Sequence, residues 1–419
     1  MIDTPSAERT LKLRLKLAWW AMPFVIAVPV LATIWMFSSS VNALTSWVLL
    51  GFSLLLLPET CHQIQQWWKT RAFKLAALTL LFCITAWHFY QGDLWLNAQA
   101  RLYVSVLLFG AALCAWFERT GDAGLRWVAL LKIAVTCFAA LSILSVIFSV
   151  SLKTNIWSEL AGSPPIYRNI RHFNSELMMA TALLCLFWGG ATRIWQHSVL
   201  LTIFALSGYL SVVSAARGAL LALAVFGIAL AIGKLVHTIK TYLLPALAFL
   251  IGGALAFLTG QTSYVLGRAG QLNGAENVSS GRIEIWGNAF HILLETRMSL
   301  LFGYGPDSFR NLLSGQYHKL IQPHNAFVQW LMDFGLLGGI VLGLFWIRLN
   351  LASLRRLRAA DTLDTNRIMA ALLLAIFVLS LVDGLMYTAT ALIIVVITGA
   401  YLIKSEEQRH GPKTAATLP

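Results

Sequence analysis

Residues 198–232 of the chain have the sequence SVLLTIFALSGYLSVVSAARGALLALAVFGIALAI. Arg217 is the one lysine, arginine or carboxylate residue in this stretch, and it lies where two apolar runs, 198–213 and 216–232, meet. Each run approaches the length of about 20 residues with which a helix crosses a bilayer. The small residues around Arg217 allow the two predicted helices to approach each other closely. This stretch therefore predicts a pair of transmembrane helices with a charge at their junction.

The same apolar character extends over the whole chain of 419 residues, of which 58% are hydrophobic and 12% charged. Soluble domains contain about 45–50% apolar and about 25% charged residues. The composition excludes a disordered chain, a coiled coil and an ordinary soluble enzyme, and the long apolar runs exclude a transmembrane β-barrel. We predict an all-α polytopic membrane protein with about 12 transmembrane helices. The predicted spans are approximately 19–37, 43–57, 73–89, 101–117, 127–150, 175–190, 198–213, 216–232, 241–260, 324–347, 368–384 and 387–403.

The distribution of basic residues predicts the orientation in the membrane. With the N-terminus in the cytoplasm, the cytoplasmic segments carry 20 lysines and arginines and the other side carries 10. Cytoplasmic loops of membrane proteins are enriched in these residues, so both termini are predicted to be cytoplasmic. The net charge of +13 is therefore expected to face anionic membrane lipids and not a nucleic acid. Residues 1–403 are predicted to form one transmembrane catalytic domain, and 404–419 a cytoplasmic tail.

Two connections on the outer side are long, namely 151–174 and 261–323. The second lies between predicted helices nine and ten, and its length far exceeds an ordinary connection. It contains a predicted amphipathic helix, Ile283–Leu294. The apolar residues expected near one face of this helix are Ile283, Trp286, Phe290 and Leu293. Long structured loops often carry function, so the outer side is the expected place of the active site.

The basic residues of the outer side are candidates for binding an anion. Arg282 lies in the large loop, which also carries Arg268, Arg297, Arg310 and Lys319, and Arg168 and Arg171 lie in the smaller loop. Arginine presents a planar fork that suits phosphate, so several arginines outside the membrane suggest a diphosphate ligand. For Arg217 the alternative is an interfacial arginine that reaches lipid phosphates. The residue pattern leaves both interpretations open.

His324 and Asn325 follow Pro323 at the start of the tenth predicted span. A histidine in the first turn of a helix feels the positive end of the helix dipole, which favours the neutral ring and lowers the pKa. His324 is therefore a candidate general base, although a lone histidine is more often an interfacial polar residue. Asp333 and Asp383 lie in or near predicted spans. Each is either a functional carboxylate or part of a salt bridge that orients helices.

Several motifs are absent from the sequence. No glycine-rich Walker loop is found, which argues against ATP hydrolysis. No cysteine and histidine cluster has the spacing of a zinc site. The first outer connection, Ser38–Asn42, has no carboxylate, whereas metal-dependent polytopic glycosyltransferases often have one there. We therefore expect chemistry without a metal or another cofactor.

An ordered set of motifs between about residues 170 and 340 resembles the O-antigen ligases of the WaaL type, within the O-antigen ligase/polymerase superfamily. Pro323-His324-Asn325, followed by Gly335-Leu336-Leu337-Gly338, is similar to the histidine and glycine signature of that family. The other matching motifs are Arg171-His172-Phe173-Asn174, Ser214-Ala215-Ala216-Arg217-Gly218-Ala219, Gly281-Arg282 with Trp286, and Leu301 to Phe309. The first 150 residues match in hydropathy alone.

The resemblance implies a glycosyltransferase of GT-C-like architecture in the inner membrane of a Gram-negative bacterium, with a periplasmic active site. It implies transfer of O-antigen polysaccharide from undecaprenyl diphosphate to the lipid A–core oligosaccharide, with inversion and without metal or nucleotide. His324 would be the general base, and Arg217 and Arg282 would neutralise the diphosphate. Arg168, Arg171, His172 and Asn325 are further candidates for contacts with donor or acceptor.

Two alternatives to a ligase remain. An O-antigen polymerase uses the same donor, but its loops often carry an arginine followed eleven positions later by glycine. The outer arginines lack this spacing, and Arg282 for example is followed by Leu293. A transporter of lipid-linked sugars would be expected to have broken helices and polar residues near the bilayer midplane.

Overall fold

A computed structural model of the chain describes residues 5–35, 38–91, 98–120, 170–214, 217–232, 234–259, 281–306, 308–313, 323–359, 364–385 and 388–410. Every regular element in these ranges is a helix, which confirms the predicted all-α class. The helices are α1 (Pro5–Trp35), α2 (Ser38–Leu55), α3 (Leu57–Trp68), α4 (Arg71–Gln91), α5 (Ala98–Thr120), α8 (Ile170–Trp188), α9 (Ile194–Val213), α10 (Arg217–Ala231), α11 (Leu235–Leu258), α14 (Arg282–Leu294), α15 (Arg297–Phe302), α16 (Ser308–Leu313), α17 (Ala326–Arg358), α18 (Asp364–Val382) and α19 (Ala389–His410).

Six of the described helices are long and apolar enough to cross a membrane. They are the Glu8–Ala32 part of α1 and the whole of α5, α9, α11, α17 and α18. Helices α2 and α3 form a pair bent by 91° and add a seventh candidate if the pair is one span. Two shorter apolar helices, α10 and the Ala389–Ile403 part of α19, accompany them. The chain is therefore a helical membrane protein of the multi-pass type.

The predicted spans can be compared with these helices one by one. Eleven of the twelve coincide with a described helix, and the remaining one, 127–150, lies outside the described residues. The predicted span 43–57 ends at the sharp bend before α3, where Pro58 lies in the first turn. Proline suits that position because its missing N–H has no partner within the helix. The total of twelve spans and the orientation of the termini stay predictions.

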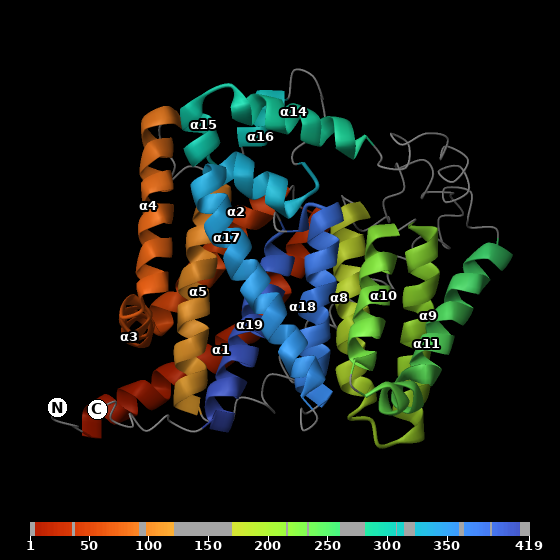
Figure 1. Cartoon of the computed structure of the whole chain (residues 1–419). Helices are drawn as coiled ribbons and strands as arrows, with labels where there is room; N and C mark the ends of the chain where they lie inside the picture. Colours follow the sequence, from red (N-terminus) through yellow and green to blue (C-terminus); the bar gives the residue numbers. More distant parts are fainter. Residues whose placement is uncertain are drawn as a thin grey trace.

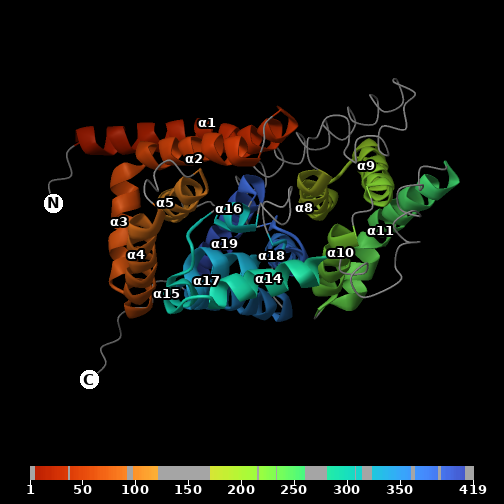
Figure 2. The ribbon, with the colours of Figure 1, turned by 90° about the horizontal axis from the view of Figure 1, so that it is seen from above.

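The central pair of helices, α17 and α18, separates α1–α5 from α8–α11 (Figure 1). Helix α17 packs against α4, α15 and α18, whereas α18 also packs against α8, α10 and α19. Helices α14, α15 and α16 lie across one end of the bundle (Figure 1). Seen along the bundle, α14 follows one long edge, and α1 and α2 follow the opposite edge (Figure 2). The segments that surround the N-terminal end of α17 therefore come from distant parts of the sequence.

Helices α9 and α11 cross at close range, and this crossing depends on glycine. A Cβ atom at Gly208 would overlap the backbone of Phe249, and one at Gly252 would overlap the backbone of Ala205. Small residues at such crossings let two backbones touch, which is a main source of attraction between helices in a membrane. Much of the remaining surface of α11 is exposed and apolar, as expected for a helix that faces lipid.

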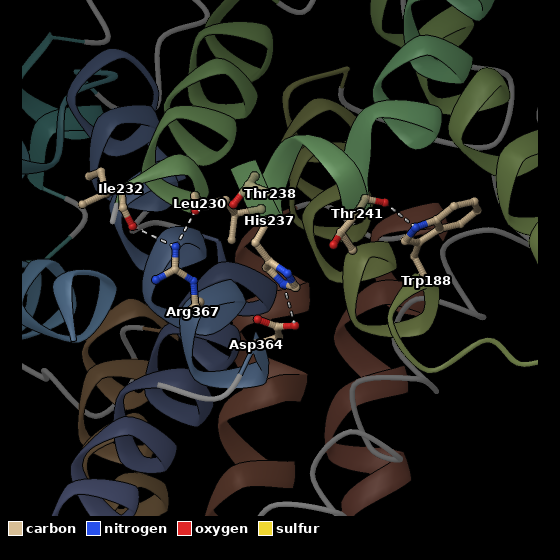
Figure 3. Close-up of polar contacts among 8 residues, drawn as sticks. All are labelled: Trp188, Leu230, Ile232, His237, Thr238, Thr241, Asp364 and Arg367. Carbon is tan, nitrogen blue, oxygen red and sulfur yellow. Dashed lines mark hydrogen bonds and ion pairs between the residues drawn. The ribbon is translucent and has the colours of Figure 1, made fainter. Parts of the chain in front are cut away.

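At the end of the bundle opposite α14, the buried guanidinium of Arg367 joins three helices (Figure 3). From the first turn of α18, its Nη1 donates to the carbonyl oxygen of Leu357 near the end of α17 at 2.7 Å. Its Nη2 donates to the carbonyl oxygens of Leu230 and Ile232 at the end of α10, at 2.6 and 2.8 Å. The last carbonyl groups of a helix lack partners within it. Arg367 therefore stabilises the ends of α10 and α17 at one point.

Two further contacts attach α11 at the same end (Figure 3). His237 of α11 lies 3.2 Å from Asp364 of α18, measured between Nε2 and Oδ2, with both side chains half exposed. The indole N–H of Trp188, at the end of α8, donates to the carbonyl oxygen of Thr241 in α11 at 2.7 Å. These contacts fix one end of the bundle and leave the opposite end, under α14, as the place for a site.

Candidate functional site

The N-terminus of α17 is anchored by Asn325. Its side-chain oxygen accepts hydrogen bonds from the backbone N–H groups of Phe327 and Val328, at 2.9 and 3.2 Å, which makes it the N-cap. Its amide nitrogen donates to the carbonyl oxygen of Leu381 near the end of α18 at 3.0 Å. The Asn325 amide group therefore joins α17 to α18, and its predicted contact with a substrate stays a prediction.

His324 lies just before this cap, buried to 4% exposure, with a positive φ of 56°. Its Nδ1 is 3.5 Å from Oδ1 of Asp383, the residue that follows α18. A carboxylate beside Nδ1 favours the tautomer that carries its proton there, and Nε2 is then the nitrogen that can accept a proton. The pairing connects the residue after α18 to the residue before the α17 cap, and the role of Asp383 stays a hypothesis.

The expected position of His324 in the first turn of a helix is wrong. Helix α17 begins at Ala326, because the short asparagine side chain is the better cap for its free N–H groups. His324 therefore precedes the cap by one residue. The predicted lowering of its pKa rested on the helix dipole at that position, and it stays a prediction.

Arg282 reaches this region as the first residue of α14. Gly281 precedes it with a φ of 73°, a left-handed conformation that glycine adopts easily. One turn further, the indole N–H of Trp286 donates to the carbonyl oxygen of Pro323 at 2.7 Å. This hydrogen bond brings the N-terminal half of α14 next to the residue that precedes His324. The Arg282 side chain is half-buried.

Arg217 reaches the region as the first residue of α10, with an exposed side chain. The next residue, Gly218, packs on α18, since a Cβ atom there would lie 3.2 Å from Leu379 and 3.3 Å from Val382. Val382 is the neighbour of Asp383 in the sequence. The start of α10 is thus packed against the end of α18 that pairs with His324.

The candidate site is therefore the convergence of three helix N-termini, those of α10, α14 and α17, at the end of α18. Each N-terminus carries a partial positive charge and N–H groups without partners within the helix. Arg217 and Arg282 add two full positive charges at two of these ends. Helix N-termini with arginines form a suitable environment for a phosphate group. The arrangement can bind an anion beside an imidazole that is oriented by a carboxylate.

The remaining predicted contacts concern α8. Arg168 lies outside the described residues. Arg171 and His172 lie in the first turn of α8, which begins four residues earlier than the predicted loop ends, and His172 is half-buried. Helix α8 packs against α10 and α18. These residues are therefore on a helix that adjoins the site.

Sequence analysis missed Glu176, which is buried in α8 at 5% exposure. Its Oε1 accepts a hydrogen bond from the hydroxyl of Thr390 in α19 at 3.0 Å. The available signal was an acidic residue inside the predicted span 175–190, because an ionisable group within a membrane is a functional candidate by default.

A second missed feature is a break in α17 at Gly335, where φ is 63° and ψ is −167°. The backbone N–H of Tyr304 donates to the carbonyl oxygen of Met332 at 2.7 Å, and that of Gly305 to Asp333 at 3.0 Å. These two hydrogen bonds, here named the clasp, use carbonyl groups that the break has freed. The clasp joins the segment that follows α15 to the part of α17 that directly precedes the break.

Asp333 is fully buried beside the clasp. Its Oδ1 accepts a hydrogen bond from the Gln329 amide at 2.7 Å, and its Oδ2 accepts one from the Tyr103 hydroxyl at 3.1 Å. Tyr103 belongs to α5, so the carboxylate connects α5 and α17. This geometry favours the helix-orienting interpretation of Asp333. Among the described residues, no group of three or more His, Cys, Asp or Glu side chains could hold a metal ion.

A comparison with protein families finds a match to part of the chain. Residues 201–343 match the family described as O-antigen ligase. The matched region contains Arg217, Arg282, His324 and the clasp, but it ends before Asp383. A comparison with curated proteins found no match.

Proposed function

We propose that the chain, whose residues 201–343 match the O-antigen ligase family, is an O-antigen ligase within the O-antigen ligase/polymerase superfamily. It would transfer O-antigen polysaccharide from undecaprenyl diphosphate to the lipid A–core oligosaccharide. The proposed location is the bacterial inner membrane, with both termini in the cytoplasm and the active site facing the periplasm. The proposed large periplasmic loop then includes α14, α15 and α16.

The observation that carries this proposal is the His324–Asp383 pair at the convergence of three helix N-termini. A donor linked through diphosphate brings its own leaving group, so the enzyme needs cations for that group and a base for the acceptor. Arg217 and Arg282 are the proposed cations, and His324 is the proposed base. Asp383 is the proposed positioning residue that orients the imidazole.

In the proposed reaction, a hydroxyl oxygen of the acceptor sugar attacks the anomeric carbon of the donor. Nε2 of His324 accepts the hydroxyl proton while the new carbon–oxygen bond forms. The bond between the anomeric carbon and the phosphate oxygen breaks, and undecaprenyl diphosphate leaves with the bonding electrons. The arginines neutralise the charge that develops on the diphosphate. One displacement of this kind inverts the anomeric configuration and needs neither nucleotide nor metal.

A transporter would also be expected to contain a broken helix, and α17 is broken at Gly335. In transporters the freed carbonyl groups commonly bind a coupling ion. Here the carbonyl oxygens of Met332 and Asp333 accept backbone hydrogen bonds from the clasp. The break is therefore better explained as a fixed connection between two segments of the chain than as an ion-binding site. This favours an enzyme over a transporter.

The test uses the purified protein in lipid nanodiscs with an undecaprenyl-diphosphate-linked glycan and lipid A–core acceptor, without nucleotide. A ligase produces glycan attached to the core. A polymerase instead produces longer lipid-linked glycan without the acceptor, and a transporter produces no new glycosidic bond. We expect His324→Ala to lower the ligation rate by about two to four orders of magnitude. His291→Ala, at an exposed position of α14, is the matched control and should keep wild-type activity.

A further inference from the structure

Helix α14 is amphipathic, as predicted, but it is rotated relative to the predicted face. The side chains that pack on α17 and α16 are Ile285, Ala289 and Leu293, in a cluster with Val328, Met332 and Phe309. Ile283 and Phe290, which were predicted to lie near one face with Leu293, are exposed. The contact with α17 therefore leaves a second apolar surface of α14 without a partner among the described residues.

The next helix, α15, also carries exposed apolar residues, and the two sets together are here named the outer apolar face. Its members and their exposed fractions are Ile283 (56%), Phe290 (43%), Leu294 (63%), Met298 (47%) and Leu301 (39%). On α14 the three residues are separated by seven and four positions, which places them on one side of the helix. A group of large exposed apolar side chains of this kind indicates an interaction site.

A third side of α14 has a different character. Glu284, His291 and Glu295 are exposed there, between the packed face and the outer apolar face. Helix α14 thus has three sides, one packed on protein, one charged and one apolar. This distribution is typical of a helix that lies in the plane of a membrane surface.

The outer apolar face adjoins α17 and α4, both of which carry exposed apolar residues. The backbone of Leu301 touches α17 so closely that a Cβ atom at Gly335 would overlap it, and two residues further Leu337 is 40% exposed. On the other side, the ring of Phe302 lies 5.2 Å from that of Phe82 in α4, which is 60% exposed. Since α17 is a candidate span, its exposed apolar residues face lipid. The α15 part of the outer apolar face therefore lies next to the lipid-facing surface of α17.

The placement of α14 agrees with this arrangement. It lies across the end of the bundle and along one of its edges, and not over the middle (Figure 1, Figure 2). An edge helix has the bilayer beside it. Charged residues Arg282 and Arg297, at the starts of α14 and α15, are of the type that pairs with lipid phosphates at such a surface.

We propose that α14 and α15 lie in the membrane surface, with the outer apolar face immersed at the boundary between headgroups and acyl chains. The partner is the lipid of the leaflet on the α14 side. This seating would hold Arg282 at the depth of the lipid phosphates. The diphosphate of a lipid-linked donor lies at the same depth, so Arg282 and the diphosphate would be at the same level in the membrane. This last inference rests on the proposed function.

The test measures depth and needs no substrate. The native cysteines are replaced, and single cysteines at Phe290 and Leu294 carry nitroxide labels in vesicles of phosphatidylethanolamine and phosphatidylglycerol. Matched controls are Glu284→Cys on the charged side of the same helix, and Leu344→Cys on the exposed surface of α17. Accessibility to oxygen, which concentrates in lipid, is compared with accessibility to a water-soluble nickel chelate.

We expect the labels at Phe290 and Leu294 to favour oxygen several-fold, as at Leu344, whereas the label at Glu284 favours the nickel chelate. Labels at Phe290 and Leu294 that behave like the one at Glu284 would place the face in water and overturn the proposal. Low accessibility to both reagents, with spin–spin broadening, would identify a second copy of the chain as the partner and also overturn it. If the variant at Phe290 or Leu294 does not fold, the label is placed at Ile283→Cys instead.

The depth measurement and the proposed function can fail separately. Labels in water would refute the membrane seating while ligation by the wild-type protein still supported the enzyme. Labels in lipid on a protein without ligase activity would support the seating and reject the function.

Discussion

The clasp between the segment after α15 and the broken α17 gives the sharpest structural prediction. Gly335 has a φ of 63° and a ψ of −167°, a combination that is essentially restricted to glycine. Its backbone touches Leu301, so a Cβ atom would overlap the carbonyl group of that residue and the nitrogen of Phe302. Both are backbone atoms, which cannot move away as a flexible side chain could. Gly335→Ala should therefore open the clasp.

The expected cost has two parts. Backbone strain at such a position costs about 1–3 kcal/mol. The two hydrogen bonds of the clasp contribute about 0.5–1.5 kcal/mol each, and their loss brings the total to roughly 2–6 kcal/mol. For a chain of 419 residues, a change of this size lowers the Tm by on the order of 5 °C. The effect should be larger in residues around the α15–α17 contact than at the opposite end of the bundle.

The assay is thermal unfolding of the purified protein in detergent. Gly287→Ala is the matched control, because no atom lies within 4 Å of a Cβ atom at that position of α14. Its Tm should stay unchanged or rise slightly, since alanine favours a helix over glycine. Gly303→Ala meets Gly335 and Met332 across the same contact, so the double variant should lose less than the sum of the single losses. A wild-type Tm for Gly335→Ala would refute the described clasp.

Three further predictions concern activity and packing. Asp383→Asn should lower the ligation rate by about two orders of magnitude, with donor binding kept, and a wild-type rate would remove Asp383 as a positioning residue. Arg282→Ala should abolish transfer, and Arg282→Lys should restore it only partly because lysine lacks the bidentate fork. The control variant Arg297→Ala, at an exposed position, should remain active. Full activity of Arg282→Ala in the same assay would exclude it from the site. Gly208→Val should destabilise the α9–α11 crossing by about 1–3 kcal/mol in thermal unfolding, and Gly227→Val, which meets no atom within 4 Å, should not.

The helices were predictable because hydrophobic length is a strong local signal. Eleven predicted spans coincide with helices, and the amphipathic helix in the large loop was found within one residue of its observed start. The sequence could not predict the rotation of α14, because Ile283 and Ile285 are equally apolar. The choice of packed face depends on the shape of α17, which is a tertiary property. The break at Gly335 was equally hidden, since a glycine in an apolar helix is common in membranes.

The candidate site was predictable as a set of residues and not as a geometry. Arg217 and His324 were noticed as charged or titratable residues beside predicted spans, and Arg282 as an arginine of the large outer loop. The resemblance to the O-antigen ligases then singled out these three residues. Their convergence depends on Trp286, which bonds the backbone of Pro323, and on the close fit of Gly218 against α18. Contacts of this kind cannot be predicted from the sequence. In the first, one partner is a backbone oxygen, which every residue has, and in the second the close fit depends on the absence of a side chain.

The conformation of His324 itself supports its proposed role. A positive φ costs a residue with a Cβ atom about 1–2 kcal/mol, and glycine or asparagine would occupy that position more easily. The surrounding contacts nevertheless hold it there, with Asn325 bound to Leu381 and Trp286 bound to Pro323 on either side. Burial adds the desolvation of an imidazole, which Asp383 offsets. A position that strains the backbone and buries a titratable ring is poorly explained by stability. It is well explained if the imidazole must meet a substrate at a fixed distance from two helix N-termini that carry arginine.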